Sequence, residues 1–188
     1  MIFLDIREDG LPKILKLNVE DLSQDLIDFP DKAYSCYISA NPKYDSDEFL
    51  FGYTSLRKPS SVFSLNLKTF EKKEIWRSEV LNFDENLFEI KREKIISRDG
   101  IKVPNSLVYK KGIDLKKAPI LIYGYGSYGS IIDASFRKTM LPLLNRGFIF
   151  CISHIRGGSE MGRQWYEDGK MFKKKNTFYD FIDSTKGL

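Results

Sequence analysis

Residues 118–133, APILIYGYGSYGSIID, place an apolar run directly before a loop of glycines, serines and tyrosines. The run APILI at 118–122 has the length and composition of a buried β-strand. The loop behind it contains Gly124, Gly126 and Gly129 in the spacing G-x-G-x-x-G, a weak indication of a nucleotide's phosphates. Tyrosines inside the turn indicate a different anion, one that exists only during a reaction.

The apolar runs of the second half are arranged as at the start of a doubly wound sheet. A second buried-strand pattern, GFIFCISHI, occupies residues 147–155. Between the two runs, DASFRKTMLPLLNRG at 133–147 predicts an irregular or helical crossover that Pro142 interrupts and Gly147 stops. Nearly continuous apolar strands joined by such a crossover predict a parallel pair in an α/β sheet.

Two further elements flank this predicted strand pair. LFEIKREKIIS and IKVPNSLVYKK, at 87–97 and 101–111, predict two strands around the turn RDG. The closing stretch, NTFYDFIDSTKGL at 176–188, predicts a helix that is capped at Asn176 or Thr177. Its apolar side chains share one face and should cover the sheet; they are Phe178, Phe181 and Ile182.

The chain before residue 80 differs from this α/β pattern, because all its elements have the pattern of short strands. MIFLDI and KILKLN flank REDGLP, and SVFSLNL and KKEIWR flank KTFE, which predicts two hairpins. AYSCYISA and EFLFGYTS predict two more strands, joined by the turn-rich NPKYDSD. Four antiparallel strands make one propeller blade, so residues 1–77 predict about one and a half blades of a partial β-propeller. Residues 78–188 then form the α/β part.

Composition argues against several classes of protein. The chain has 188 residues, 42% of them apolar, which is enough for a buried core. Its net charge of +4 balances 30 basic against 26 acidic residues without a basic stripe, which argues against nucleic acid as a partner. The N-terminus lacks a signal peptide's apolar core, and no run is long enough to span a membrane. Cys36 and Cys151 fit no metal site or disulfide framework, so we expect a reducing, cytoplasmic compartment.

Three long motifs follow one another in the second half: YGYGSYGSIID, RGFIFCISHIRGGSEMG and QWYEDGKMFKKKNTFYDF. In this order and spacing they resemble the prolyl oligopeptidase family of serine peptidases, most closely its oligopeptidase B (protease II) branch. The resemblance is strongest over residues 86–183. It implies an α/β-hydrolase domain capped by a seven-bladed propeller, and cleavage of short peptides. The chain is therefore expected to hold the end of the propeller and the N-terminal part of the hydrolase domain.

This resemblance gives the loop tyrosines a role. In acyl transfer, negative charge develops on the former carbonyl oxygen, and one preorganised donor contributes about 3 kcal/mol of stabilisation. By resemblance the Tyr125 hydroxyl is such a donor in the oxyanion hole, and Tyr128 is a substrate-binding residue. A tyrosine packed in its loop is the plain alternative.

The dinucleotide alternative is weaker. A bulky tyrosine fills the glycine turn, and the next strand ends in His154 and Arg156 where a ribose-binding carboxylate is expected. We therefore expect no cofactor.

Two acidic residues behind this loop receive a basic substrate side chain in oligopeptidase B. By resemblance Asp133 is the first of them and binds substrate, whereas Ser135 stands in place of the second. This departure weakens the expected preference for paired basic residues. The equal alternative is that Asp133 caps the crossover that follows it.

No catalytic triad is assigned in the sequence, because the fold needs a G-x-S-x-G nucleophile, then an aspartate, then a histidine. The nearest match, GGSEM around Ser159, lacks the second glycine. His154 is the only histidine and precedes this serine, so we interpret it as a strand-end residue. Arg156 and Glu160 are predicted to pair across the glycine loop, and the lysines at 173–175 to form a solvated face.

The sequence thus predicts a segment of a serine-type oligopeptidase that acts on peptides, with basic residues preferred. It would contribute one oxyanion-hole donor but no nucleophile, so it is expected to be inactive alone and to need a complementary C-terminal hydrolase segment. The alternative is a non-catalytic interaction protein or a remnant. On the segment hypothesis, the open side of the strand at 118–123 should be an apolar sheet edge.

Overall fold

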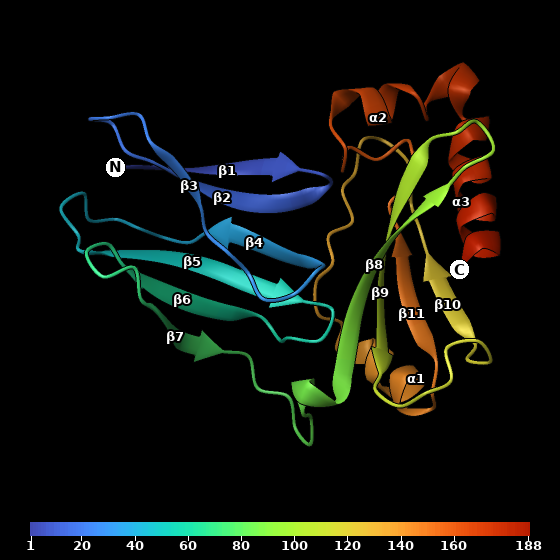
Figure 1. Ribbon diagram of the computed structural model, residues 1–188, viewed down its shortest axis with the longest axis horizontal. Helices are drawn as coiled ribbons and strands as arrows, with labels where there is room; N and C mark the ends of the chain where they lie inside the picture. The colour runs from blue at the N-terminus through green and yellow to red at the C-terminus, as the bar shows by residue number, and fades with distance from the viewer.

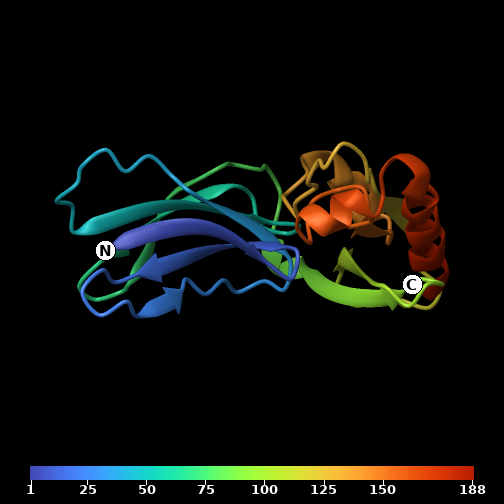
Figure 2. The same ribbon diagram turned by 90° about the horizontal axis from the view of Figure 1, so that it is seen from above.

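The protein consists of two parts that lie next to each other along the longest axis of the molecule (Figure 1). The computed structural model describes all residues, 1–188. Seven strands form the first part, and a four-stranded sheet with short helices forms the second. The view from above shows the N-terminus at the far end of the first part and the C-terminus at the far end of the second (Figure 2).

The chain begins with a small antiparallel sheet. Strands β1 (Ile2–Glu8) and β2 (Leu11–Leu17) pair as the predicted hairpin, and β3 (Gln24–Leu26) adds to β2. The hairpin turns at Asp9 and Gly10, which both have positive φ, 51° and 75°. Two consecutive left-handed residues are characteristic of the tight turn that matches the twist of paired strands.

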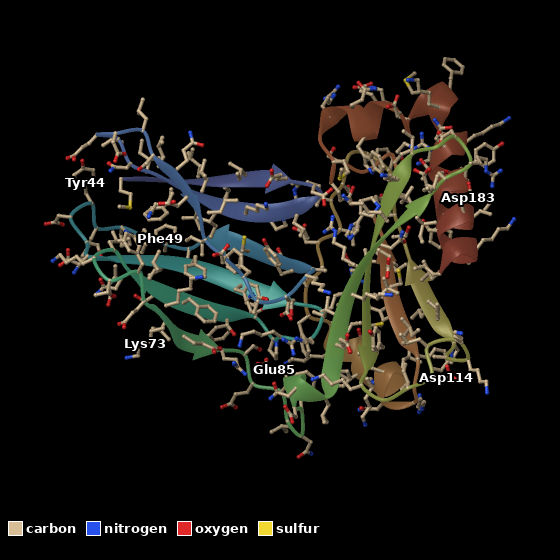
Figure 3. All side chains as sticks on the ribbon, viewed as in Figure 1. Tyr44, Phe49, Lys73, Glu85, Asp114 and Asp183 are labelled. Carbon is tan, nitrogen blue, oxygen red and sulfur yellow. The ribbon has the colours of Figure 1, made fainter.

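The second sheet is a complete antiparallel blade whose strands pair in chain order. Its strands are β4 (Tyr34–Ile38), β5 (Glu48–Ser55), β6 (Ser61–Asn66) and β7 (Lys72–Arg77), as the sequence predicts. The two sheets enclose an aromatic core in which Phe49 stacks on Phe3, with ring centroids 3.6 Å apart (Figure 3). The predicted one and a half blades therefore correspond to a four-stranded and a three-stranded sheet.

The second part is built on a mixed sheet with the strand order β10-β11-β9-β8. Its strands are β8 (Phe88–Ile96), β9 (Lys102–Lys110), β10 (Ile120–Tyr123) and β11 (Ile149–Ser153). The predicted parallel pair is confirmed, because β10 and β11 run parallel. Of this parallel pair, only β11 is buried along its whole length. Strand β10 lies at the sheet edge with one neighbour, and Leu121 and Tyr123 are more than a third exposed.

The crossover between β10 and β11 ends in the short turn η2 (Lys138–Met140) and the helix α1 (Leu141–Asn145). The prediction that Pro142 interrupts this crossover is wrong, since Pro142 lies in the first turn of α1. A proline is well suited there, because the first turn's N–H groups have no partner within the helix. Gly147 has φ of 85° after the helix and stops it, as predicted.

The remaining helical elements follow β11. They are α2 (Arg163–Glu167), η3 (Met171–Lys173) and α3 (Lys175–Gly187), and η1 (Glu85–Leu87) precedes β8. None of the helices is long and apolar enough to cross a membrane.

Helix α3 differs from its prediction at the cap and at the buried face. It starts two or three residues early, with Lys174 as a cap that makes no side-chain bond. Phe178 and Ile182 are exposed, and the buried residues are Thr177, Asp180 and Ser184. The helix packs on β8 and β9 with this polar face. It does so because each of the three side chains has a buried hydrogen-bond partner beneath it.

One hydrophobic core joins the two parts of the chain. Ala33 and Leu56 come from the first part, and Phe150 and Ile152 of β11 come from the second. Leu144 of α1 completes the same cluster and is 2% exposed. The two parts are therefore held by shared apolar burial, the dominant favourable term in folding.

We expect Leu144→Ala to lower the free energy of unfolding by about 2–5 kcal/mol, because it opens a cavity in the shared core. Leu121→Ala on β10 is the matched control. Since Leu121 is 39% exposed, the loss there should stay below about 1 kcal/mol. Urea unfolding followed by circular dichroism measures both, and equal losses would contradict the placement of these two leucines.

Candidate functional site

The candidate site consists of two glycine loops at the carboxyl ends of β10 and β11. The first loop follows Tyr123 and the second follows Ser153, and the N–H of Gly129 donates to the carbonyl of Gly157 at 3.0 Å. A Cβ on Gly157 would lie 2.1 Å from the carbonyl oxygen of Gly126. The two backbones therefore approach so closely that only glycine fits. The carboxyl ends of parallel strands are where α/β proteins place their ligands.

The two tyrosines of interest lie on the open side of the first loop. Tyr125 is 46% exposed and Tyr128 is 86% exposed, and neither hydroxyl makes a hydrogen bond within the chain. Tyr128 has φ of 57°, so the backbone turns sharply at this residue. Both phenols are thus exposed, whereas the backbone of their loop packs against the second glycine loop at Gly157. Their predicted roles in the oxyanion hole and in substrate binding stay predictions.

A lysine holds the first loop from below. Lys174 Nζ donates to the carbonyl of Gly126 at 2.5 Å and to Oγ of Ser127 at 2.7 Å. Burial lowers the pKa of Lys174, which is only partly accessible. The prediction that the lysines at 173–175 form a solvated face is thus wrong for the middle one. Its ammonium is anchored to the tyrosine loop by tertiary contacts that no local pattern reveals.

The second loop is held by Arg156, which is 4% exposed. Nε and Nη2 of its guanidinium donate to the carboxylate of Asp180 at 2.8 and 2.6 Å, and Nη1 lies 2.6 Å from Asp99. Burial opposes the charged form, but these hydrogen bonds prevail and raise the pKa of Arg156. Asp183, one turn beyond Asp180, bonds Arg98 and fastens the helix to the same β-turn (Figure 3).

Glu160 does not pair with Arg156, which corrects the prediction from their spacing. Its Oε1 accepts from the backbone N–H of Ile132 at 3.0 Å. Burial raises the pKa of Glu160. No cation lies against its carboxyl group to offset this effect. The residue therefore joins the second glycine loop to the end of the first and carries no ion pair across the loop.

His154 is a buried residue directly after β11, as predicted. Its Nε2 lies 2.8 Å from the hydroxyl of Ser106, and the side chain is 2% exposed. Burial, and then the charges of Arg92 and Arg7, lower the pKa of His154 to about 3. The imidazole is therefore neutral at pH 7 and makes no hydrogen bond with Ser159.

Asp133 lies where the two parts of the chain meet. Its carboxylate accepts from Arg7 of β1, with Nη1 at 2.9 Å and Nη2 at 3.3 Å, and from the hydroxyl of Ser35 at 3.4 Å. The crossover elements η2 and α1 have no side-chain cap. The alternative that Asp133 caps the crossover is therefore wrong, and its partners belong to the propeller sheets.

The first glycine loop does not lead into a helix. After Tyr123 the chain is irregular as far as Arg137, and the next helical turn is η2. A pyrophosphate site of the dinucleotide type needs a helix N-terminus directly behind the glycines. The geometry thus lacks the element on which the dinucleotide alternative depends.

Comparison with known proteins assigns both parts of the chain to one family. The profile of the N-terminal β-propeller domain of prolyl oligopeptidase matches residues 1–79, and the profile of the prolyl oligopeptidase family matches residues 134–188. The chain belongs to the prolyl oligopeptidase family. Its fold is the end of that family's propeller followed by the start of its α/β-hydrolase domain, with the propeller left open.

Members of the prolyl oligopeptidase family resemble this chain along nearly its whole length. Dipeptidyl aminopeptidase BI of Pseudoxanthomonas mexicana is 42% identical over 93% of the chain, and Protease 2 of Moraxella lacunata 42% over 97%. Oligopeptidase B from Trypanosoma brucei superimposes with a TM-score of 0.84 at 35% identity, over 99% of this chain and 28% of that one. The chain spans about a quarter of the length of its curated relatives, 24% and 26% for these two.

Among the residues that shape the site, sequence reasoning missed Arg7, Lys174, Asp99 and Asp180. Arg7 lies 126 residues from its partner Asp133. Asp180 is inside a helix whose pattern suggests an apolar buried face. No local signal identifies these residues, because their partners come from other elements.

We expect stability to fall as the pH drops below about 6.5, because the buried His154 resists protonation while an unfolded imidazole accepts a proton. The folded state binds fewer protons between its pKa of about 3 and the unfolded value of 6.5. From pH 7 to pH 5 this group should remove roughly 2 kcal/mol of unfolding free energy.

His154→Gln should abolish that loss while it retains a polar partner for Ser106. Urea unfolding of both proteins at the two pH values measures the difference. The chain contains one histidine, so no other imidazole contributes. An equal loss in both proteins would contradict a buried, neutral His154.

Proposed function

We propose that the chain forms part of a serine-type oligopeptidase that cleaves short peptides next to basic residues. Membership of the prolyl oligopeptidase family and the names of the relatives support a peptidase. The observation that carries the proposal is Tyr125, whose unbonded hydroxyl projects from a rigid loop at the carboxyl ends of the parallel strands.

The proposed role of Tyr125 is to donate its O–H to the oxyanion. When a nucleophile attacks a peptide carbonyl, the oxygen acquires negative charge in the tetrahedral intermediate. A donor that is already in place stabilises this charge without reorganisation. The backbone packing of Gly126 on Gly157 and the two hydrogen bonds from Lys174 hold the loop backbone, which supports a donor that is in place before the reaction begins.

The serine, aspartate and histidine of the triad are proposed to come from a segment outside residues 1–188. Within these residues the single histidine is buried and bonded to Ser106, and no base reaches Ser159. Strand β10 has an open hydrogen-bonding edge beside the tyrosine loop. A strand that leads to the nucleophile would pair with this edge and bring the serine to the same end of the sheet as Tyr125.

Substrate contacts are proposed for Tyr128 and Asp133. Tyr128 lines a cavity of about 240 Å³ beside the loop, together with Ser127, Tyr166, Gly169, Lys170, Met171 and Lys174. Asp133 would receive a basic side chain through its carboxylate. Ser135 offers no second carboxylate, so this chain provides one acidic group where oligopeptidase B provides two.

We expect Tyr125→Phe to lower kcat by about a hundredfold with KM nearly unchanged, because the donor acts only in the transition state. The measurement is hydrolysis of an arginyl amide by the peptidase assembled from this chain and the segment with the triad. Tyr123→Phe is the matched control two residues earlier. Its ring keeps the contact with Arg137, and kcat should not change. A similar loss in both variants would contradict an oxyanion role for Tyr125.

The 188-residue chain by itself should not hydrolyse an arginyl amide, because His154 is neutral, buried and turned toward Ser106. The assay compares the chain with its Ser159→Ala variant at equal concentration. Turnover that disappears in the variant would show that Ser159 is a nucleophile. The proposal that the triad comes from elsewhere would then be wrong.

A further inference from the structure

The carboxylate of Asp133 already holds an arginine of this chain. Arg7 Nη1 and Nη2 donate to Oδ1 and Oδ2, which is the two-pronged contact that guanidinium groups make with carboxylates. A peptide arginine would seek the same two oxygens with the same geometry. Since Ser135 supplies no second carboxylate, the internal and the external arginine compete for one acceptor.

Arg7 is carried by a hairpin tip that lies against the hydrolase part. Its Nη1 also donates to the carbonyl of Gly10 at 3.0 Å, which stiffens the tip. Asp9 forms an ion pair with Lys94 at 2.7 Å and accepts from Arg92 through its carbonyl. These contacts keep the arginine close to Asp133 even when the two side chains separate.

The pair is partly open to solvent. The Arg7 side chain is 23% exposed and the Asp133 side chain 30% exposed. A ligand can therefore reach the carboxylate, and the arginine can move aside, without the two parts of the chain coming apart. The apolar core shared by these parts does not include either residue.

We propose that Arg7 is an internal competitor that occupies Asp133 in the free protein and must be displaced by a basic substrate side chain. The inference rests on the proposed substrate role of Asp133. Arg7 is then a specificity-determining residue, because it lowers the affinity for a basic side chain at this position and leaves neutral side chains unaffected. Displacement also removes one ion pair between the hairpin and the hydrolase part, so the hairpin tip loosens when such a substrate binds.

The test is an NMR titration of the 188-residue chain with N-acetyl-Arg-Arg-amide, followed at the backbone amides of Asp133 and Gly10. Arg7→Gln should tighten binding by about fivefold, the factor that an exposed ion pair of ordinary strength imposes on a competitor. Arg7→Lys, which retains the charge but not the fork, should tighten it less. N-acetyl-Ala-Ala-amide, which has no basic side chain, should bind the wild type and Arg7→Gln equally.

Lys16→Gln is the matched control, because it removes the same charge from the same sheet and its partner is Asp25. Its affinity for the peptide should equal that of the wild type. Asp133→Asn should weaken binding and abolish the effect of Arg7→Gln in the double variant.

The outcomes separate the inference from the proposed function. If Asp133→Asn weakens binding but Arg7→Gln does not tighten it, Arg7 is no competitor and the substrate role of Asp133 stands. If Asp133→Asn leaves binding unchanged, Asp133 is no substrate group and both ideas fail. Tightening by Lys16→Gln equal to that by Arg7→Gln would indicate general electrostatics and would also overturn the competitor role.

Discussion

The buried guanidinium of Arg156 is the interaction on which the arrangement of the site depends. It joins the end of β11 to α3 through Asp180 and to the turn between β8 and β9 through Asp99. Both Arg156 and Asp180 are almost inaccessible, so removal of Arg156 would leave the carboxylate of Asp180 uncompensated in the interior. With this loop fixed, Gly157 supports Gly126 by direct backbone contact, and the position of Tyr125 follows.

The same ion pair explains why α3 presents a polar face to the sheet. Asp180 is directed inward by the arginine, and Thr177 and Ser184 lie on the same side and bond Gly169 and Asn105. Phe178 and Ile182 are consequently turned outward. Strand β10 also exposes apolar surface, because it has no neighbour on one side and its Leu121 is exposed. Apolar edges of this kind accept further strands, which fits a chain that spans about a quarter of its relatives' length.

Two different forces join the propeller part to the hydrolase part. The apolar cluster around Phe150 and Leu144 supplies non-directional burial and includes residues from both sides. The pair of Arg7 with Asp133 supplies a directional contact at the rim, where solvent weakens it. The apolar cluster includes Ala134, the neighbour of Asp133, but not the Asp133 side chain itself, whose contact is the ion pair with Arg7. This division allows a ligand to replace the ion pair without loss of the fold.

The sequence alone determined most strands of the sheets, with the short β3 as the exception, together with the parallel pair and the family. Alternation in the first 77 residues, the apolar runs around Ile122 and Ile152, and three motifs in order are local properties that a single chain displays before it folds. Tertiary structure alone decided the partners of the charged residues and the buried face of α3. Arg156 pairs with Asp180 and not with Glu160, which is closer in the sequence. Asp133 pairs with Arg7, which lies 126 residues away along the chain. The reason is physical: propensity and periodicity act between neighbours along the chain, whereas a buried charge takes whichever opposite charge the packed elements bring to it.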